Sequence, residues 1–140
     1  MKTSAKSIIS MALMILVASI SPATAVTYPS PPKVVVLDCG THATKPDSLT
    51  IYCADFGVNV NHIKWTKWAQ SGAVGTGQYS ANNCTPNCAS GKIISANVKL
   101  TLNASKLIKS EYVMNTLNIT TVNGKPLPLL KKNTDKWVLE

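Results

Sequence analysis

The segment Ile94–Leu102 constrains the fold most, because apolar and polar residues alternate along it without a break. One side of this segment, when extended, carries Ile94, Ala96, Val98, Leu100 and Leu102, and the other carries Ser95, Asn97, Lys99 and Thr101. A period of two is typical of a strand that has one face on a core and the other in water, as in antiparallel sheets. We therefore expect a half-buried strand here.

Several other short segments are rich in β-formers and are bounded by turn residues. They predict strands at residues 34–37, 49–53, 60–68, 74–80 and 112–122, with another at 137–139. Gly75 and Gly77 make 74–80 a strand only with a bulge or a close backbone approach. Seven or eight short strands predict an all-β fold, a small antiparallel sandwich or open barrel.

Two further elements are expected in the C-terminal third. Asn123-Gly124 is a strong hairpin signal, which makes residues 125–130 the expected partner of 112–122. Pro126 and Pro128 place that partner at a sheet edge, because proline cannot donate to the ladder. Residues 103–110 are predicted to hold a short helical turn.

The first 25 residues have the three parts of an export signal. Lys2 and Lys6 are followed by the apolar run Ile8–Ile20 and by Ala23-Thr24-Ala25, which fits the small-x-small cleavage rule. This run of 13 residues is too short to cross a bilayer, which takes about 20 apolar residues. We expect cleavage after Ala25, a proline-rich leader at 26–33, a single β-domain at 34–140, and a secreted chain without a stable membrane anchor.

Four cysteines follow the export signal. An even number in an oxidising compartment indicates two disulfides, and nearness in sequence favours Cys39–Cys53 and Cys84–Cys88. Two disulfides would help to stabilise a domain whose hydrophobic core is modest. The alternative is a metal site, for which the spacing is only loosely finger-like; its ligands would be Cys84, Cys88, His42 and His62. We expect disulfides, with no metal and no other cofactor.

The charge of the chain comes from lysine alone. All fourteen basic residues are Lys; two lie in the export signal, which leaves twelve against six carboxylates, a net charge of +6. The absence of Arg disfavours phosphate and base readout, and no window of the sequence is a basic cluster. The partners we expect are anionic cell-envelope polymers or a protein, and not nucleic acid.

The middle of the chain carries a combined pattern. It consists of Thr50-Ile51-x-Cys53-Ala54-Asp55, Trp65-x-x-Trp68, Ala73-x-Gly75-x-Gly77 and Asn83-Cys84-x-Pro86-x-Cys88-Ala89-x-Gly91, followed by the alternating strand. In this pattern the chain resembles a group of small, uncharacterised exported proteins of actinobacteria. The resemblance covers roughly residues 38–102, and it implies export and a disulfide-stapled fold but no activity.

Trp65 and Trp68 are the first candidates for a binding surface, because exposed Trp stacks on sugars or anchors a partner. In a straight strand the two rings point to opposite faces, so one is core and the other outside. A bulge near Thr66-Lys67 would bring both to one side. The alternative is that both are structural.

Asp38, Asp55 and His62 are the weak catalytic candidates. A Cys39–Cys53 bond would bring the two carboxylates close together, and paired carboxylates suit glycoside hydrolysis or cation binding. The simpler interpretation is that each Asp caps a turn.

Three functions follow from these observations. The first is an exported, non-catalytic β-domain that binds envelope material or a protein. The second is a small hydrolase that uses Asp55, Asp38 and His62, and the third is a secreted protein inhibitor. A deep cleft lined by these three residues would favour the enzyme, a flat face with Trp and Lys would favour binding, and a protruding loop at Asn82–Gly91 would favour the inhibitor.

Overall fold

The computed structural model describes residues 29–54 and 57–140, and its β-structure lies within the unit Pro31–Glu140. The expected export signal at 1–25, the start of the leader and Asp55 lie outside the described residues. The described residues form ten strands and no α-helix, which confirms the all-β prediction. The strands are β1 (Lys33–Asp38), β2 (Thr41–Ala43), β3 (Leu49–Thr50), β4 (Val58–Ala69), β5 (Gly72–Asn82), β6 (Ile93–Leu102), β7 (Lys106–Ile108), β8 (Glu111–Met114), β9 (Thr116–Thr121) and β10 (Thr134–Val138).

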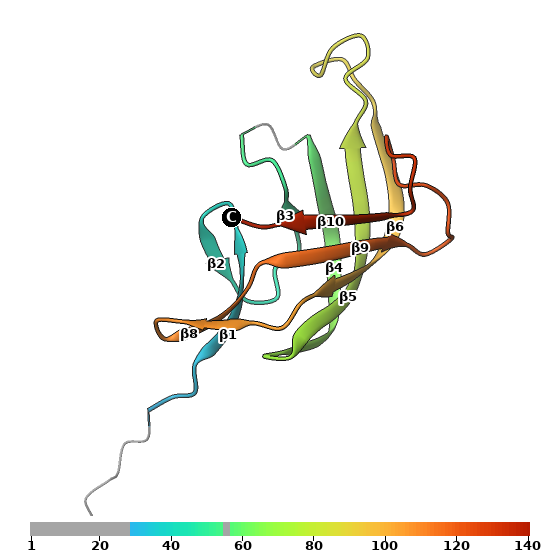
Figure 1. Ribbon diagram of the computed structural model, residues 1–140. Coiled ribbons are helices and arrows are strands. Elements are labelled where there is room, and N and C mark those ends of the chain that lie inside the picture. Colours follow the sequence, from blue (N-terminus) through green and yellow to red (C-terminus); the bar gives the residue numbers. More distant parts are fainter. Residues whose placement is uncertain (1–28, 55–56) are drawn as a thin grey trace, which may run out of the picture. The chain divides into compact units, whose positions relative to one another are not determined.

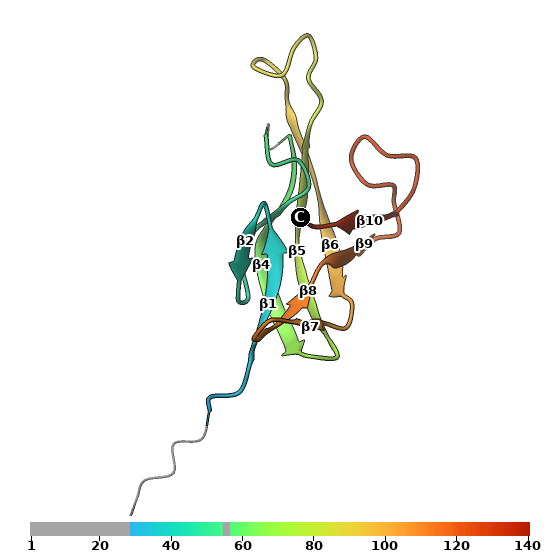
Figure 2. The ribbon, with the colours of Figure 1, turned by 60° about the vertical axis from the view of Figure 1, so that its left-hand side comes forward.

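The strands form two sheets that together make a half-barrel sandwich (Figure 1). The larger sheet has the order β10-β9-β6-β5-β4-β3 and the smaller the order β2-β1-β8-β7. All pairs are antiparallel except β1 with β8, which run parallel. Figure 2 shows the long hairpin of β4 and β5 continuing into β6, which forms the body of the larger sheet.

The chain changes sheets at Asn115, between β8 and β9. The sequence predicted one strand over 112–122, and the structure corrects this to two strands in different sheets. Val113 and Met114 are both buried although they are adjacent, so the alternation breaks here. Asn115 accepts the Leu139 N–H at 2.8 Å with its backbone carbonyl, which fixes the crossing point.

Two other expectations are wrong. Residues 106–108 form the edge strand β7 and not a helical turn, because Lys106–Ile108 pairs with β8. Residues 125–130 form a loop, and β9 pairs with β10 on one side and with β6 on the other. The two prolines of this loop cannot donate to a ladder, and the loop instead buries Leu127 in the core. Residues 49–53 pair only at Leu49–Thr50.

The core fills the space enclosed by the sheets. Its largest fully buried side chains are Trp137, Leu49, Leu100, Leu102, Met114, Leu117, Ile119 and Leu127. Burial of these apolar surfaces is the main stabilising term of the domain, at roughly 25 cal/mol per Å². The inward positions of β6 are the ones that its alternation predicted from Val98 to Leu102, whereas Ile94 is 41% exposed at the sheet rim.

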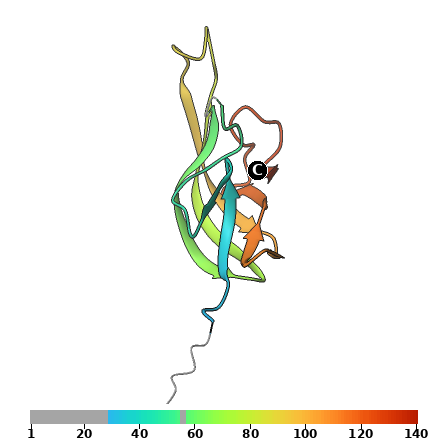
Figure 3. The same cartoon turned by 90° about the vertical axis from the view of Figure 1, so that its left-hand side faces the viewer.

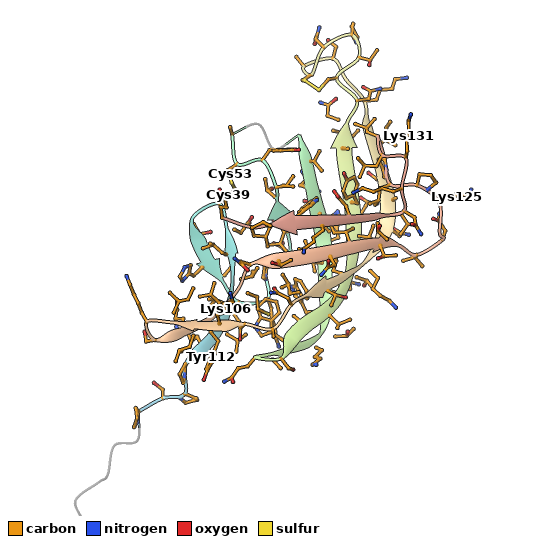
Figure 4. All side chains as sticks on the ribbon, in the orientation of Figure 1. Cys39, Cys53, Lys106, Tyr112, Lys125 and Lys131 are labelled. Atoms are coloured by element: carbon orange, nitrogen blue, oxygen red, sulfur yellow. A yellow bond between two sulfur atoms is a disulfide. The ribbon has the colours of Figure 1, made fainter. Side chains whose placement is uncertain are left out.

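Both disulfides join the cysteines expected from the sequence. Cys39 bonds Cys53, with Cα atoms 5.5 Å apart, and Cys84 bonds Cys88. The first ties the end of β1 to the segment after β3, where the two labelled side chains meet in Figure 4. Disulfides of this kind are consistent with an extracellular protein. Within the described part of the chain, nothing helical is long and apolar enough to cross a membrane.

Candidate functional site

The outer face of the larger sheet gathers lysines that are far apart in the sequence. Lys64 on β4 pairs with Thr76 on β5, and Thr76 pairs with Lys99 on β6. Residues opposite one another in an antiparallel sheet share a face, so these three side chains form one row. All three are exposed.

A second row lies one step along the same sheet. Its members are Lys67, Val74, Thr101, Asn118 and Lys136, from five neighbouring strands. Lys67 and Lys136, at the two ends of this row, are exposed. We call Lys64, Lys67, Lys99 and Lys136 the lysine face.

The other outward side chains of this sheet are mostly hydroxyls and amides. None of the carboxylates among the described residues occupies one of these outward positions. Asp135 is on the inner side of β10, where it accepts the Trp137 indole N–H at 2.9 Å. Asp47 precedes β3 at the sheet edge, and its carbonyl accepts the Ile63 N–H. The four lysines of this face therefore carry positive charge that no carboxylate of the described residues on the same face neutralises.

An open hollow of about 380 Å³ lies beside the lysine face and is bordered by one of its members, Lys64. Its floor is the β5 segment Thr76–Gln78, and its sides are His62 and Lys64 of β4 together with Asn97, Val98 and Val122. Val122 is 67% exposed. The hollow combines a cation, amides, a hydroxyl and one apolar side chain.

Two bulges in β4 shape this region. The register with β5 shifts between Asn61 and Lys64 and again between Trp65 and Lys67. His62 lies in the first bulge with φ +52°, a left-handed conformation that histidine tolerates better than most residues. A bulge bends its strand and increases the twist, which turns Ile63 into the core and leaves His62 outside.

Gly75 and Gly77 permit the close approach of β5 to the bulged strand. A Cβ at Gly75 would lie 2.8 Å from the Lys64 carbonyl oxygen and 2.9 Å from a ring carbon of Trp65. One at Gly77 would lie 2.9 Å from a methyl group of Val60. The close backbone approach expected from these glycines is thus present, and the bulges belong to the neighbouring strand.

The second bulge brings Trp65 and Trp68 to the same, inner side of β4. Their rings meet edge to face with centroids 4.9 Å apart, and both pack partly buried against the core. The Trp65 indole N–H donates to the Pro46 carbonyl at 2.7 Å, and that of Trp68 donates to the Val34 carbonyl at 2.9 Å. These contacts tie β4 to β1 and to the turn before β3, so the geometry favours the structural role.

The described members of the catalytic hypothesis do not share a cleft. One Asp38 carboxylate oxygen accepts the Thr50 backbone N–H at 3.1 Å, a contact between the end of β1 and β3 rather than the local turn cap that the sequence suggested. His62 lines the hollow, and Asp38 does not. Asp55 lies outside the described residues.

The stapled loop, Asn82–Gly91, projects past the ends of β5 and β6 in every view (Figures 1, 2 and 3). Besides its disulfide it is held by asparagine side chains. Asn82 accepts the Cys84 N–H at 2.9 Å and donates to the Cys88 carbonyl at 2.8 Å. Asn83 accepts the Lys92 N–H at 2.8 Å. The loop is therefore both exposed and internally braced.

Sequence reasoning missed the lysine face, because its four members come from three separate segments, at 64–67, 99 and 136. The available signal was that Lys99 occupies a polar position of the most regular predicted strand. The register with the neighbouring strands, which the structure shows, places the other three lysines on the same face. Among the described residues no three His, Cys, Asp or Glu side chains gather as a metal site, and all four cysteines are in disulfides.

Comparisons of the chain with models of known protein families, with curated proteins and with solved structures found no match.

Proposed function

We propose that the chain is an exported, non-catalytic binding domain whose lysine face holds an anionic polymer of the cell envelope. The observation that carries this proposal is the gathering of four lysines on one sheet face, where no carboxylate of the described residues points outward. The sequence alone predicted a binding domain with scattered charge, and the fold supplies a surface on which that charge is concentrated.

Lysine suits this role because it is a flexible point charge that attracts an anion without demanding a fixed geometry. Exposed charge pairs contribute little individually, about 0–1 kcal/mol, so four lysines give weak binding that depends on their sum. Such binding is screened by salt, because the Debye length falls from about 10 Å at 0.1 M to about 3 Å at 1 M.

The proposal of export rests on the signal-like sequence of residues 1–25. The two disulfides are consistent with an exported protein. The mature chain then begins at Val26. Intact-mass measurement of the protein from a culture medium tests this, and retention of residues 1–25 in that material would contradict it.

The test of the lysine face is retention on purified cell wall as salt is raised from 0.1 to 1 M. We expect retention to fall steeply over this range, and K64Q/K99Q to weaken it severalfold at 0.1 M. The matched control is K33Q/K106Q, which removes the same charge from the smaller sheet, where Figure 4 labels Lys106. Equal losses in the two variants would mean that net charge, and not this face, is responsible.

A second candidate function is binding of a protein through the stapled loop, as in a secreted inhibitor. The projecting, braced loop favours it, because pre-organised recognition elements lose little entropy on binding. Ala89→Arg places a bulky cation on this loop, and Ser71→Arg places the same group at the β4–β5 turn. A protein retained from an envelope extract by the parent and by S71R, but not by A89R, would support this function. Equal retention by all three would oppose it.

The hydrolase that would use Asp38, Asp55 and His62 stays a third hypothesis. It requires that Asp55→Asn abolish cleavage of a wall polymer that the parent protein cleaves.

A further inference from the structure

The hollow beside the lysine face is lined by polar side chains that form no bond within the described part of the protein. Among the described residues, the side chains of Lys64, Thr76, Gln78 and Asn97 form no hydrogen bond or ion pair with another protein group. Four unused groups that face one hollow are therefore available to a ligand.

The unused groups form a mixed set of donors and acceptors. The Lys64 ammonium offers only donors, whereas the amides of Gln78 and Asn97 each offer donors and one acceptor oxygen, and the Thr76 hydroxyl offers both. Neighbouring hydroxyls on a sugar ring also act as both donor and acceptor, so amides match them. A bare polyphosphate has acceptors alone and would leave the amide oxygens unpaired.

The remaining lining also fits a sugar. Val122 is an exposed apolar side chain at one side of the hollow, able to pack on the C–H groups of a pyranose ring. The volume of about 380 Å³ lies at the lower end of the range of small-molecule sites, about 300–1,000 Å³. His62 adds a further ring nitrogen at the edge of the hollow.

We infer that this hollow is the subsite for one carboxylate-bearing pyranose of an acidic polysaccharide lying along the lysine face. This inference rests on the proposed function and names the chemistry of its ligand. Lys64 pairs with the sugar carboxylate, the amides and Thr76 bind ring hydroxyls, and Lys99 receives the next charge of the polymer, because it is in the same row as Lys64.

The experiment is an NMR titration of the full mature chain with tetragalacturonate at 0.15 M salt. Two matched probes separate the two parts of the recognition: the methyl ester of tetragalacturonate keeps the hydroxyls without the charge, and tripolyphosphate keeps charge without hydroxyls. We expect the backbone amide signals of Thr76, Gln78 and Asn97 to move with tetragalacturonate. The two other probes are expected to bind several-fold more weakly.

The double variant Q78A/N97A removes both amides and leaves the charge unchanged. Loss of two hydrogen bonds predicts about tenfold weaker binding of tetragalacturonate and unchanged binding of tripolyphosphate. The control is Asn118→Ala, an exposed amide on the same face outside the hollow. If Q78A/N97A binds tetragalacturonate as the parent does, the subsite is refuted while the lysine face stands. If no anionic probe binds the parent at low salt, the proposed function itself fails.

Discussion

The indole pair of β4 allows the structural and binding roles of tryptophan to be separated experimentally. Trp65→Phe and Trp68→Phe each keep an aromatic ring and remove one indole N–H···O=C hydrogen bond, to Pro46 or Val34. Such a bond contributes about 0.5–1.5 kcal/mol, and the smaller ring leaves unfilled volume against the core. We expect each variant to lose about 1–2 kcal/mol of the free energy of unfolding.

This loss converts into a measurable melting temperature. Residues 31–140 make a unit of 110 residues, and an unfolding entropy of about 2.1 cal/mol/K per residue means that 1 kcal/mol lowers Tm by about 4 °C. Each Phe variant should therefore melt about 4–8 °C lower by calorimetry. The Ala variants should lose about 3 kcal/mol each, the low end for Trp→Ala, because both rings are only half-buried.

The edge-to-face contact adds a second test. Such pairs contribute about 0.5–1.5 kcal/mol, so the Ala double variant should lose less than the sum of the two single losses by that amount. Because the rings are on the inner side of β4, opposite the lysine face, the Phe variants should keep their wall retention. An unchanged Tm together with lost wall retention, in either Phe variant, would refute the inward placement.

Two further predictions concern stability. Burial raises the pKa of Tyr79 from 10.0 to about 12, and the nearby charges of Asp135 and then Tyr52 add to this effect. The unfolded chain therefore loses the Tyr79 proton at a lower pH than the folded chain does. As a result, the contribution of Tyr79 to the free energy of unfolding is fully present below about pH 10 and is lost as pH rises toward 12. Urea midpoints of the parent should fall faster in that window than those of Y79F, and parallel falls would contradict the shift. Gly75→Ala places a methyl group against the Lys64 carbonyl and the Trp65 ring and should cost about 1–3 kcal/mol in urea unfolding; a cost under about 0.5 kcal/mol would show that β4 can move away.

What the sequence predicted well was local. The alternation of 94–102 and the short loop between Cys84 and Cys88 are each contained within about ten residues, and both are present in the structure. The pairing of Cys39 with Cys53 was also predictable, because only a short segment separates them. Such features depend on strand period and loop closure, which neighbouring residues determine.

The features that could not be predicted from the sequence depend on strand register and on tertiary context. The pairing of β9 with β10, rather than with 125–130, requires a loop that places Leu127 in the core. The bulge at Thr66 was only one of two possibilities for the tryptophans, and the glycines of the opposite strand made it possible. Lys64 and Lys99 are neighbours only through Thr76, which no sequence window reveals.

The lysine face and the core are two consequences of the same register. Lys99 lies between Val98 and Leu100, both fully buried, so its outward position is fixed by the burial of its neighbours. A slip of one residue would place Lys99 in the core and both apolar side chains in water. The register therefore favours a polar residue at most outward positions, but it does not require lysine there and does not exclude a carboxylate. The fold accommodates Asp135 on the inner side of β10, paired with an indole N–H, while Lys136 next to it faces outward. Among the described strands of the larger sheet, four lysines face outward and the one carboxylate, Asp135, faces inward, and the core does not require this choice of charges. The excess of positive charge on the outer face is what supports a binding role for it.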